Sequence, residues 1–313
     1  MENKEKNFVS AVIYVHNAER RIEKFLSMII GIMEDNFAHS EIICVNDCSD
    51  DASVDMIKKV SDTAKTTSIS VVNMSFFHGL ELAMDAGMDL AIGDFVFEFD
   101  NTILDFEPEM IMKIYRHSLT GYDIVSASPN RKEKLSSRLF YKVFDRFAEN
   151  SHDMTTESFR ILSRRVINRI SSMNKTIPYR KAIYAGSGLK TANLKYEVKM
   201  EGRRDNVDSK EKRYRTSLAV DTLILFTEFG YRFSFWMTSA MMLISVFMIL
   251  YTVVVYVIGH PIEGWTTTVL FLSVAFLGLF GILTIIVKYL QIIVDMVFKR
   301  KHYNFESIEK LTK

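Results

Sequence analysis

The chain has 313 residues, of which 48% are hydrophobic, and its 39 basic and 38 acidic side chains leave a formal net charge of +1. This balance gives no overall attraction to nucleic acid, and the sequence contains no nucleic-acid-binding motif. The two cysteines, Cys44 and Cys48, are too few for a disulfide framework and lack the further ligands of a structural zinc site. We interpret both as reduced, cytosolic thiols.

The first hundred residues alternate short β-branched or aromatic runs with longer amphipathic stretches. The short runs predict strands, and the stretches between them have helical spacing and are long enough for right-handed crossovers. We therefore predict an α/β domain with a mainly parallel sheet covered by helices. The predicted strands are Phe8–Val15, Glu41–Val45, Ile69–Met74 and Phe95–Phe99, and the predicted helical stretches are 18–33, 51–64 and 79–92.

Polar side chains follow these predicted strands at the points where the strands end. In open α/β sheets, ligands bind in the crevice beyond the carboxyl ends of the strands. We expect side chains that are distant in sequence to converge there, namely Asn17, Asn46, Asp47 and Asp100.

The last third of the chain holds the surplus of apolar residues. A charged segment, 203–215, predicts a loop that runs into a helix at 216–230. Two charge-free apolar runs follow at 235–258 and 265–287, each near the roughly 20 residues that a spanning helix requires. Buried helices of a soluble core are the alternative, but tryptophans near the ends of both runs favour two transmembrane helices.

The distribution of basic residues predicts how these spans are oriented. Lys and Arg flank the pair of runs on both outer sides, whereas the turn between them carries none. We therefore expect both termini to be cytosolic. This interpretation divides the chain into a cytosolic domain at 1–230, the two spans, and a basic amphipathic cytosolic tail at 288–313.

Several motifs resemble those of family 2 glycosyltransferases. The segment EIICVNDCSDDAS, residues 41–53, resembles the family's strand-turn-helix motif, and AVIYVHNAERRIEKFL, residues 11–26, resembles the strand and helix start before it. Residues 78–111 resemble the helix, Gly-Asp turn and strand that lead to the family's acidic metal-binding motif. FRILSRRVI, residues 159–167, resembles the acceptor-side motif of the polyprenyl-phosphate branch. With two terminal spans, this order resembles the polyisoprenyl-phosphate glycosyltransferases, which include bactoprenol glucosyltransferases and dolichyl-phosphate mannose synthases.

The resemblance implies a GT-A-type, Rossmann-like fold and an inverting hexosyltransferase. Such an enzyme moves a sugar from a nucleoside diphosphate sugar, here UDP-hexose by preference, to a polyprenyl phosphate at the cytosolic face of a bacterial plasma membrane. The resemblance also implies a homo-oligomer. Because the transfer expels a diphosphate whose growing negative charge must be neutralised, a carboxylate-bound Mg²⁺ or Mn²⁺ is the implied cofactor.

The resemblance also assigns roles to individual residues on the donor side. Asp47 is the candidate nucleoside contact, and its alternative role is to cap the helix that follows it. Asp100 matches the first aspartate of the metal motif, and Asp105 is the substitute for the second, which is Thr102 here. The alternative for this segment is a solvated acidic turn. The remaining donor-side candidates are Asn17, Glu19 and Asn46.

On the acceptor side, Ser158 stands where the family has an aspartate that orients the acceptor phosphate, and Arg160 is the candidate phosphate-binding residue of the same motif. A surface arginine that merely forms a salt bridge is the alternative for Arg160. The basic loop is the candidate for contact with the diphosphate or lipid phosphate, and ordinary positive-inside flanking of a span is its alternative. Its basic residues are Arg203, Arg204, Lys210 and Arg213.

A second functional hypothesis comes from the positions at which the chain departs from the family pattern. Carboxylates or an arginine of the family are replaced at Asn46, Phe76, Thr102 and Ser158. These replacements favour a catalytically weak or inactive homologue that serves as a scaffold or regulatory partner in the assembly of a cell-surface polysaccharide.

Overall fold

A computed structural model of the chain describes residues 4–130, 157–172, 180–198 and 303–312, with scattered helical positions between 236 and 293. The predicted basic loop and juxtamembrane helix lie outside the described residues, as does most of both predicted spans. Within the part that is described, no helix combines the length and the apolar character needed to cross a membrane.

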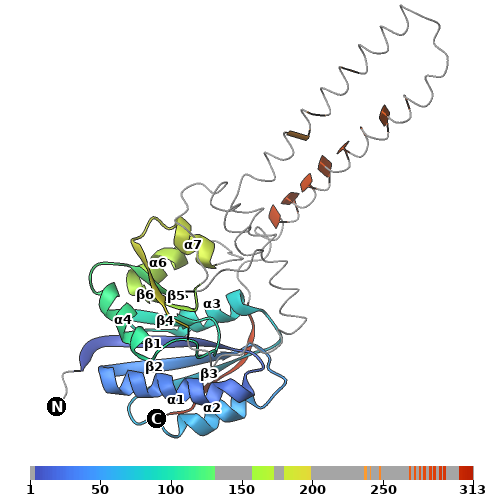
Figure 1. The fold of residues 1–313 in the computed structure, drawn as a ribbon. Coiled ribbons are helices and arrows are strands. Elements are labelled where there is room, and N and C mark those ends of the chain that lie inside the picture. The colour runs from blue at the N-terminus through green and yellow to red at the C-terminus, as the bar shows by residue number, and fades with distance from the viewer. Residues whose placement is uncertain are drawn as a thin grey trace, which may run out of the picture.

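The described ranges form an eight-stranded mixed sheet in the order β7-β5-β6-β4-β1-β2-β3-β8 (Figure 1). Strands β1 to β4 are parallel neighbours, as predicted, and β5 and β7 are also parallel to each other. Strand β6 runs antiparallel to β4 and β5, and β8 runs antiparallel to β3. The strands are β1 (Glu5–Val15), β2 (Phe37–Asn46), β3 (Ser68–Met74), β4 (Phe95–Phe99), β5 (Ile124–Pro129), β6 (Phe159–Ser163), β7 (Thr191–Tyr196) and β8 (Phe305–Lys310).

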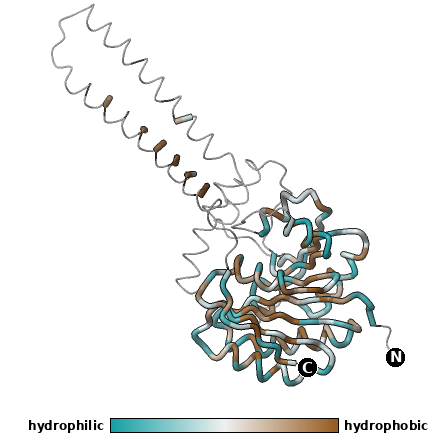
Figure 2. The backbone as a smooth tube through the Cα atoms, turned by 180° about the vertical axis from the view of Figure 1, so that it is seen from behind, coloured by the Kyte–Doolittle hydropathy of each residue, from teal (hydrophilic) through white to brown (hydrophobic). Residues whose placement is uncertain are grey.

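Helices cover both faces of the sheet, and the three predicted crossover helices are confirmed. Helices α1, α2 and α4 share one apolar core with the sheet, whereas α3, α6 and α7 share the other. Figure 2 shows the apolar strands in the interior of the domain. The helices are α1 (Glu19–Asn36), α2 (Ser53–Ser61), α3 (Leu80–Leu90), α4 (Glu109–Ser118), α6 (Arg164–Ser172) and α7 (Arg180–Gly186).

The alternation of side chains along a strand explains how one strand serves both cores. In β1, Val9, Ala11 and Ile13 pack in the core under α1, whereas Val12 and Tyr14 pack under α3. Every one of these five side chains is buried. Because both faces are covered, the central strands consist of nearly continuous apolar runs, which made them recognisable in the sequence.

The last strand brings the end of the chain back to the domain. Strand β8 adds to the free edge of β3, and the backbone N–H of Asn304 donates to Nε2 of His78 at 3.2 Å. The hydroxyl of Tyr303 donates to Asp89 of α3 at 2.6 Å. The described end of the predicted cytosolic tail is thus a strand. This strand belongs to the same sheet as the strands before residue 199.

The contact between α3 and the sheet depends on a glycine. A Cβ atom at Gly87 would overlap the side chains of Val12 and Val45, on two neighbouring strands. At Gly31, in α1, an added Cβ would meet no atom within 4 Å. Gly87 and Gly31 are therefore a matched pair of helical positions: an added methyl group would clash at Gly87 and would not clash at Gly31.

We expect Gly87→Ala to destabilise the domain by about 1–3 kcal/mol, because the methyl group forces α3 away from β1 and β2. Gly31→Ala should be neutral or stabilise by up to about 1 kcal/mol, since alanine favours helix. Thermal melting followed by circular dichroism measures both. Equal melting temperatures for the two variants would contradict this account of the α3 contact.

Candidate functional site

The carboxyl ends of β1 and β2 are joined by a network of loop contacts. Asn17 adopts a left-handed backbone conformation with φ of 47°, and its side-chain oxygen accepts the N–H of Asp50 at 2.9 Å. The carboxylate of Glu19 accepts the N–H of Ala52 at 3.2 Å, and its own N–H donates to Asp51. Asn17 and Glu19 therefore shape the turn between β2 and α2, and donor contact by either residue stays a prediction.

Asn46 is the last residue of β2 and Asp47 follows it, and both are buried. The side chain of Asn46 donates to Asn73 on β3 at 3.0 Å. The carboxylate of Asp47 accepts the N–H groups of His78 and Gly79 at 2.8 Å each, and the hydroxyl of Tyr14 at 3.0 Å. Asp47 therefore anchors the start of α3. The alternative role, in which Asp47 caps the next helix in the chain, α2, is wrong, because α2 has no side-chain cap. The nucleoside contact of Asp47 stays a prediction.

Asp100 lies just beyond β4 and belongs to a buried ionic cluster. Glu98 and Arg160 are direct partners in the antiparallel register of β4 and β6, and Asp100 is two residues further along on the same face. Arg160 donates to Glu98 at 2.9 Å, to Asp100 at 2.7 Å and to Glu157 at 3.1 Å. Arg160 is 0% exposed, so the alternative of a surface arginine is wrong.

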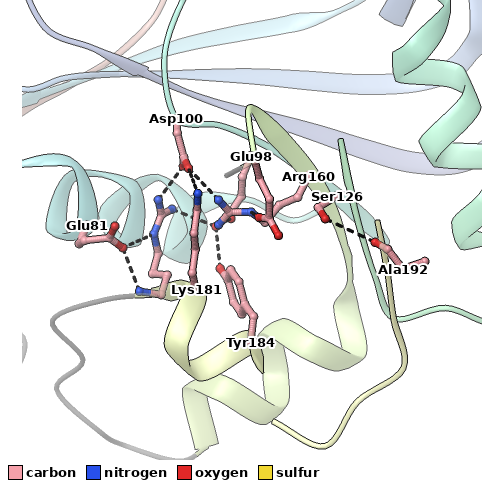
Figure 3. Close-up of polar contacts among 10 residues, drawn as sticks. Glu81, Glu98, Asp100, Ser126, Arg160, Lys181, Tyr184 and Ala192 are labelled. Atoms are coloured by element: carbon pink, nitrogen blue, oxygen red, sulfur yellow. Dashed lines mark hydrogen bonds and ion pairs between the residues drawn. The ribbon is translucent and has the colours of Figure 1, made fainter. Parts of the chain in front are cut away.

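A second arginine, Arg180, completes the cluster by pairing with Glu81, Glu98 and Asp100, the carboxylates labelled in Figure 3. Arg180, the first residue of α7, donates to Glu81 at 2.8 Å, to Glu98 at 3.0 Å and to Asp100 at 2.8 Å. One turn further along α7, the hydroxyl of Tyr184 donates to Glu98 at 2.8 Å. Glu98 and Asp100 each bridge the two arginines, so the cluster ties β4, β6, α3 and α7 together.

The charges of the cluster determine the ionisation of its members. Burial by itself would raise the pKa of Asp100, but the positive charges of Arg160, Arg180 and Lys181 outweigh it and lower this pKa to about 2. Burial and the neighbouring Glu98 raise the pKa of Tyr184, so its hydroxyl stays a donor. Asp100 is therefore a paired carboxylate whose side chain is only 10% exposed, and the alternative of a solvated acidic turn is wrong.

The other two predicted residues of this region meet through a tyrosine. The hydroxyl of Tyr196, at the end of β7, donates to Asp105 at 2.7 Å and lies 2.6 Å from the hydroxyl of Ser158. Asp105 is buried, with 8% of its surface exposed. The structure thus brings Asp100 together with Arg160, and Asp105 together with Ser158, in two adjacent clusters.

The residues at Asp100 do not fit a divalent cation as they are arranged. Hard cations such as Mg²⁺ require several oxygen ligands around one point. Both oxygens of Asp100 accept from guanidinium groups, and an oxygen of Asp105 accepts from Tyr196. Among the described residues, no group of three or more His, Cys, Asp or Glu side chains is placed to hold a metal. Metal binding by Asp100 and Asp105 stays a prediction that this geometry does not favour.

Sequence reasoning missed most of the cluster: it placed Asp100 at this edge of the sheet by its position after a predicted strand and identified Arg160 by resemblance alone. Glu98 left a signal, because it is a charged residue inside the apolar strand FVFEF. Arg180 and Glu81 have no such signal in the sequence, because only the packing of α3 and α7 on one face of the sheet brings them together. The four basic candidates between 203 and 213 lie outside the described residues.

Comparisons with known proteins agree with this fold. The model of the family "Glycosyl transferase family 2" matches residues 10–171, just over half of the chain. The solved structure of glucosyl-3-phosphoglycerate synthase from Mycobacterium tuberculosis, with Mn²⁺, uridine diphosphate and phosphoglyceric acid, superimposes with a TM-score of 0.50 at 15% identity. That superposition covers 70% of this chain and 78% of the synthase.

Two curated relatives differ in how much of the chain they match. An uncharacterized glycosyltransferase of Synechocystis sp. is 30% identical over 187 residues, and the match covers 58% of this chain and 58% of that protein. A prophage bactoprenol glucosyl transferase homolog of Escherichia coli K12 is 27% identical over 285 residues, covering 86% of this chain and 88% of the homolog.

The mixed, mostly parallel sheet with helices on both faces defines an α/β protein with a GT-A-like fold. The chain belongs to glycosyltransferase family 2.

Arg160 and Arg165 allow a test of what the buried cluster contributes to stability. We expect Arg160→Leu to destabilise by about 3–5 kcal/mol, because it removes one of the two guanidinium groups that neutralise Glu98 and Asp100. Arg165 pairs with Asp123, but its side chain is 70% exposed, so Arg165→Leu should cost no more than about 1 kcal/mol. Chemical unfolding of both variants measures the difference, and similar losses in the two would refute the structural role of the cluster.

The low pKa of Asp100 predicts how stability depends on pH. A carboxylate whose pKa is lowered on folding stabilises the fold above its ordinary pKa of 3.8, and this contribution disappears as the pH falls towards 2. We expect the stability difference between the wild type and Asp100→Asn to shrink by on the order of 2 kcal/mol between pH 4 and pH 2. Urea unfolding at several pH values measures it, and a constant difference would show that Asp100 titrates normally.

Proposed function

We propose that this protein is a membrane glycosyltransferase that moves a sugar from a nucleoside diphosphate sugar to a polyprenyl phosphate at the cytosolic face. UDP-hexose is the favoured donor. An oxygen of the acceptor phosphate attacks the anomeric carbon and the bond from that carbon to the diphosphate breaks. The nucleoside diphosphate then leaves with the electron pair, and the product is inverted.

The observation that carries this proposal is the extent of the similarity to the Escherichia coli bactoprenol glucosyl transferase homolog. A match over 86% of the chain cannot be contained in residues 1–198, so it continues into the apolar final third. A purely cytosolic family member would share only the catalytic domain. The proposed acceptor, a bactoprenol-like polyprenyl phosphate, follows from the name of that relative.

The position of β8 supports the proposed arrangement in the membrane. Strand β8, after residue 302, pairs with β3, which belongs to the domain formed by the described residues before 199. Any membrane segment between them must leave and return on the same side, which requires an even number of crossings. The apolar runs at 235–258 and 265–287 supply two. We therefore propose two spans with both termini in the cytosol, in a bacterial plasma membrane, and a homo-oligomeric assembly.

The residues of the crevice have distinct parts in the proposed reaction. The loops after β1 and β2, shaped by Asn17 and Glu19, form the wall against which the nucleoside binds. Asp47 holds the start of α3 at the same edge of the sheet. The basic residues at 203–213 are proposed to meet the phosphates. Mg²⁺ and Mn²⁺ are the cations to test, although the side chains around Asp100 are not arranged as their ligands.

A scaffold or regulatory function in cell-surface polysaccharide assembly is the second candidate. The observation that favours it is the pairing of Asp100 with Arg160 and Arg180. By resemblance Asp100 is the metal ligand of the family, and here its oxygens are already bound by the arginines. Ser158, the counterpart of an acceptor-side aspartate, is likewise engaged by Tyr196. A scaffold has no need of nucleotide affinity, and this separates it from the transferase.

The test is a transfer assay with the full chain in lipid nanodiscs that contain a polyprenyl phosphate. Radiolabelled UDP-glucose, UDP-galactose, UDP-N-acetylglucosamine and GDP-mannose are supplied in turn, and extracted lipid is examined for label. We expect one donor to yield lipid-linked sugar, and Asp100→Ala to abolish it by disrupting the cluster beside the crevice. Lys65→Met, on the exposed surface before β3, is the control and should retain full activity.

The negative outcome is equally informative. If no donor yields labelled lipid, and neither UDP nor GDP binds in calorimetry, the transferase is excluded and the scaffold remains. Binding without transfer to lipid would keep the nucleotide site and reject the polyprenyl acceptor.

A further inference from the structure

Asp100 matches a metal ligand by resemblance of its motif, yet two arginines already neutralise it. Nη2 of Arg160 lies 2.7 Å from one carboxylate oxygen, and Nη2 of Arg180 lies 2.8 Å from the other. A divalent cation at these oxygens would stand within a few ångströms of two guanidinium groups, where like charges repel strongly in a buried site. The cation could bind only if the arginines moved away.

The carboxylates of the cluster all have positive partners without any metal. Glu81, Glu98, Asp100 and Glu157 supply four negative charges, and Arg160, Arg180 and Lys181 supply three positive ones. Each nitrogen of the Arg180 guanidinium has its own carboxylate partner. A further cation would have to displace one of these partners, because no carboxylate of the four is left without a positive neighbour.

The arginines are also too enclosed to meet a ligand themselves. The side chain of Arg160 is 0% exposed and that of Arg180 is 4% exposed. Lys181, the next residue on α7, differs from both: its side chain is 16% exposed, and its Nζ lies 4.0 Å from Asp100. Figure 3 shows the side chain of Lys181 extending towards Asp100. Of the three cations of the cluster, Lys181 has the most exposed side chain.

We propose, building on the function proposed above, that protein cations replace the divalent metal in this chain. Arg160 and Arg180 hold Asp100 in place of the metal, and Lys181 binds the diphosphate of the donor nucleotide. An ammonium with three donors at the edge of a buried ionic cluster suits phosphate oxygens. The arginines are positioning residues, since they act through Asp100 and the start of α7 and do not touch the nucleotide.

Nucleotide binding tests this without requiring turnover. Calorimetry on the full chain in nanodiscs gives the Kd of UDP, of GDP and of uridine, in EDTA and in Mn²⁺. We expect UDP or GDP to bind in EDTA, with a Kd that Mn²⁺ changes by less than about threefold. Lys181→Met should weaken diphosphate binding about tenfold or more, as for the loss of one charge-assisted hydrogen bond, and leave uridine binding unchanged. Lys65→Met is the matched control and should bind like the wild type.

The opposite results separate the two proposals. UDP binding that needs Mn²⁺ and is lost in Asp100→Asn would overturn the inference while leaving the transferase intact. Asp100→Glu serves the same purpose if the first variant does not fold, because it keeps the charge but shifts the oxygens. Unchanged UDP affinity in Lys181→Met also overturns the inference. Absence of any nucleotide binding, in EDTA and in Mn²⁺, would reject the proposed function together with the inference.

Discussion

The pairing of Glu98 and Asp100 with two arginines is the interaction on which the arrangement of this crevice depends. Buried charges are stable only when they are paired and hydrogen-bonded, so each arginine must stay where both carboxylates can reach it. Arg160 comes from β6 and Arg180 from α7, two elements that are separated in sequence by undescribed residues. The cluster therefore fixes α7 and β6 against β4.

The same face of the sheet carries a second long-range connection, through α3. Asp47 binds the backbone just before α3, Glu81 in its first turn binds Arg180, and Asp89 near its end binds Tyr303 from the returning chain. Helix α3 thus contacts the end of β2, the ionic cluster and the C-terminal segment. A shift of the segment before β8 would be transmitted to the start of α3 by the contact of Asn304 with His78.

Family membership and local chemistry provide different kinds of information about this chain. The family model and the GT-A-like fold identify a glycosyltransferase scaffold built on a mostly parallel sheet. The chemistry available there depends on individual side chains, and at Asp100 these form a closed set of ion pairs. The resemblance of its motif predicts a cation at Asp100, whereas the geometry places two guanidinium groups there.

The sequence by itself determined the first four strands, the three helices between them and the edge of the sheet at which Asn46, Asp47 and Asp100 lie. Local patterns suffice for these features, because buried parallel strands are continuously apolar and crossover helices are amphipathic. Only the tertiary structure decided the partners of Asp100, the burial of Arg160 and the pairing of β8 with β3. These features join residues that are 60 or more positions apart, and no local pattern of hydrophobicity or charge records which distant side chains will meet.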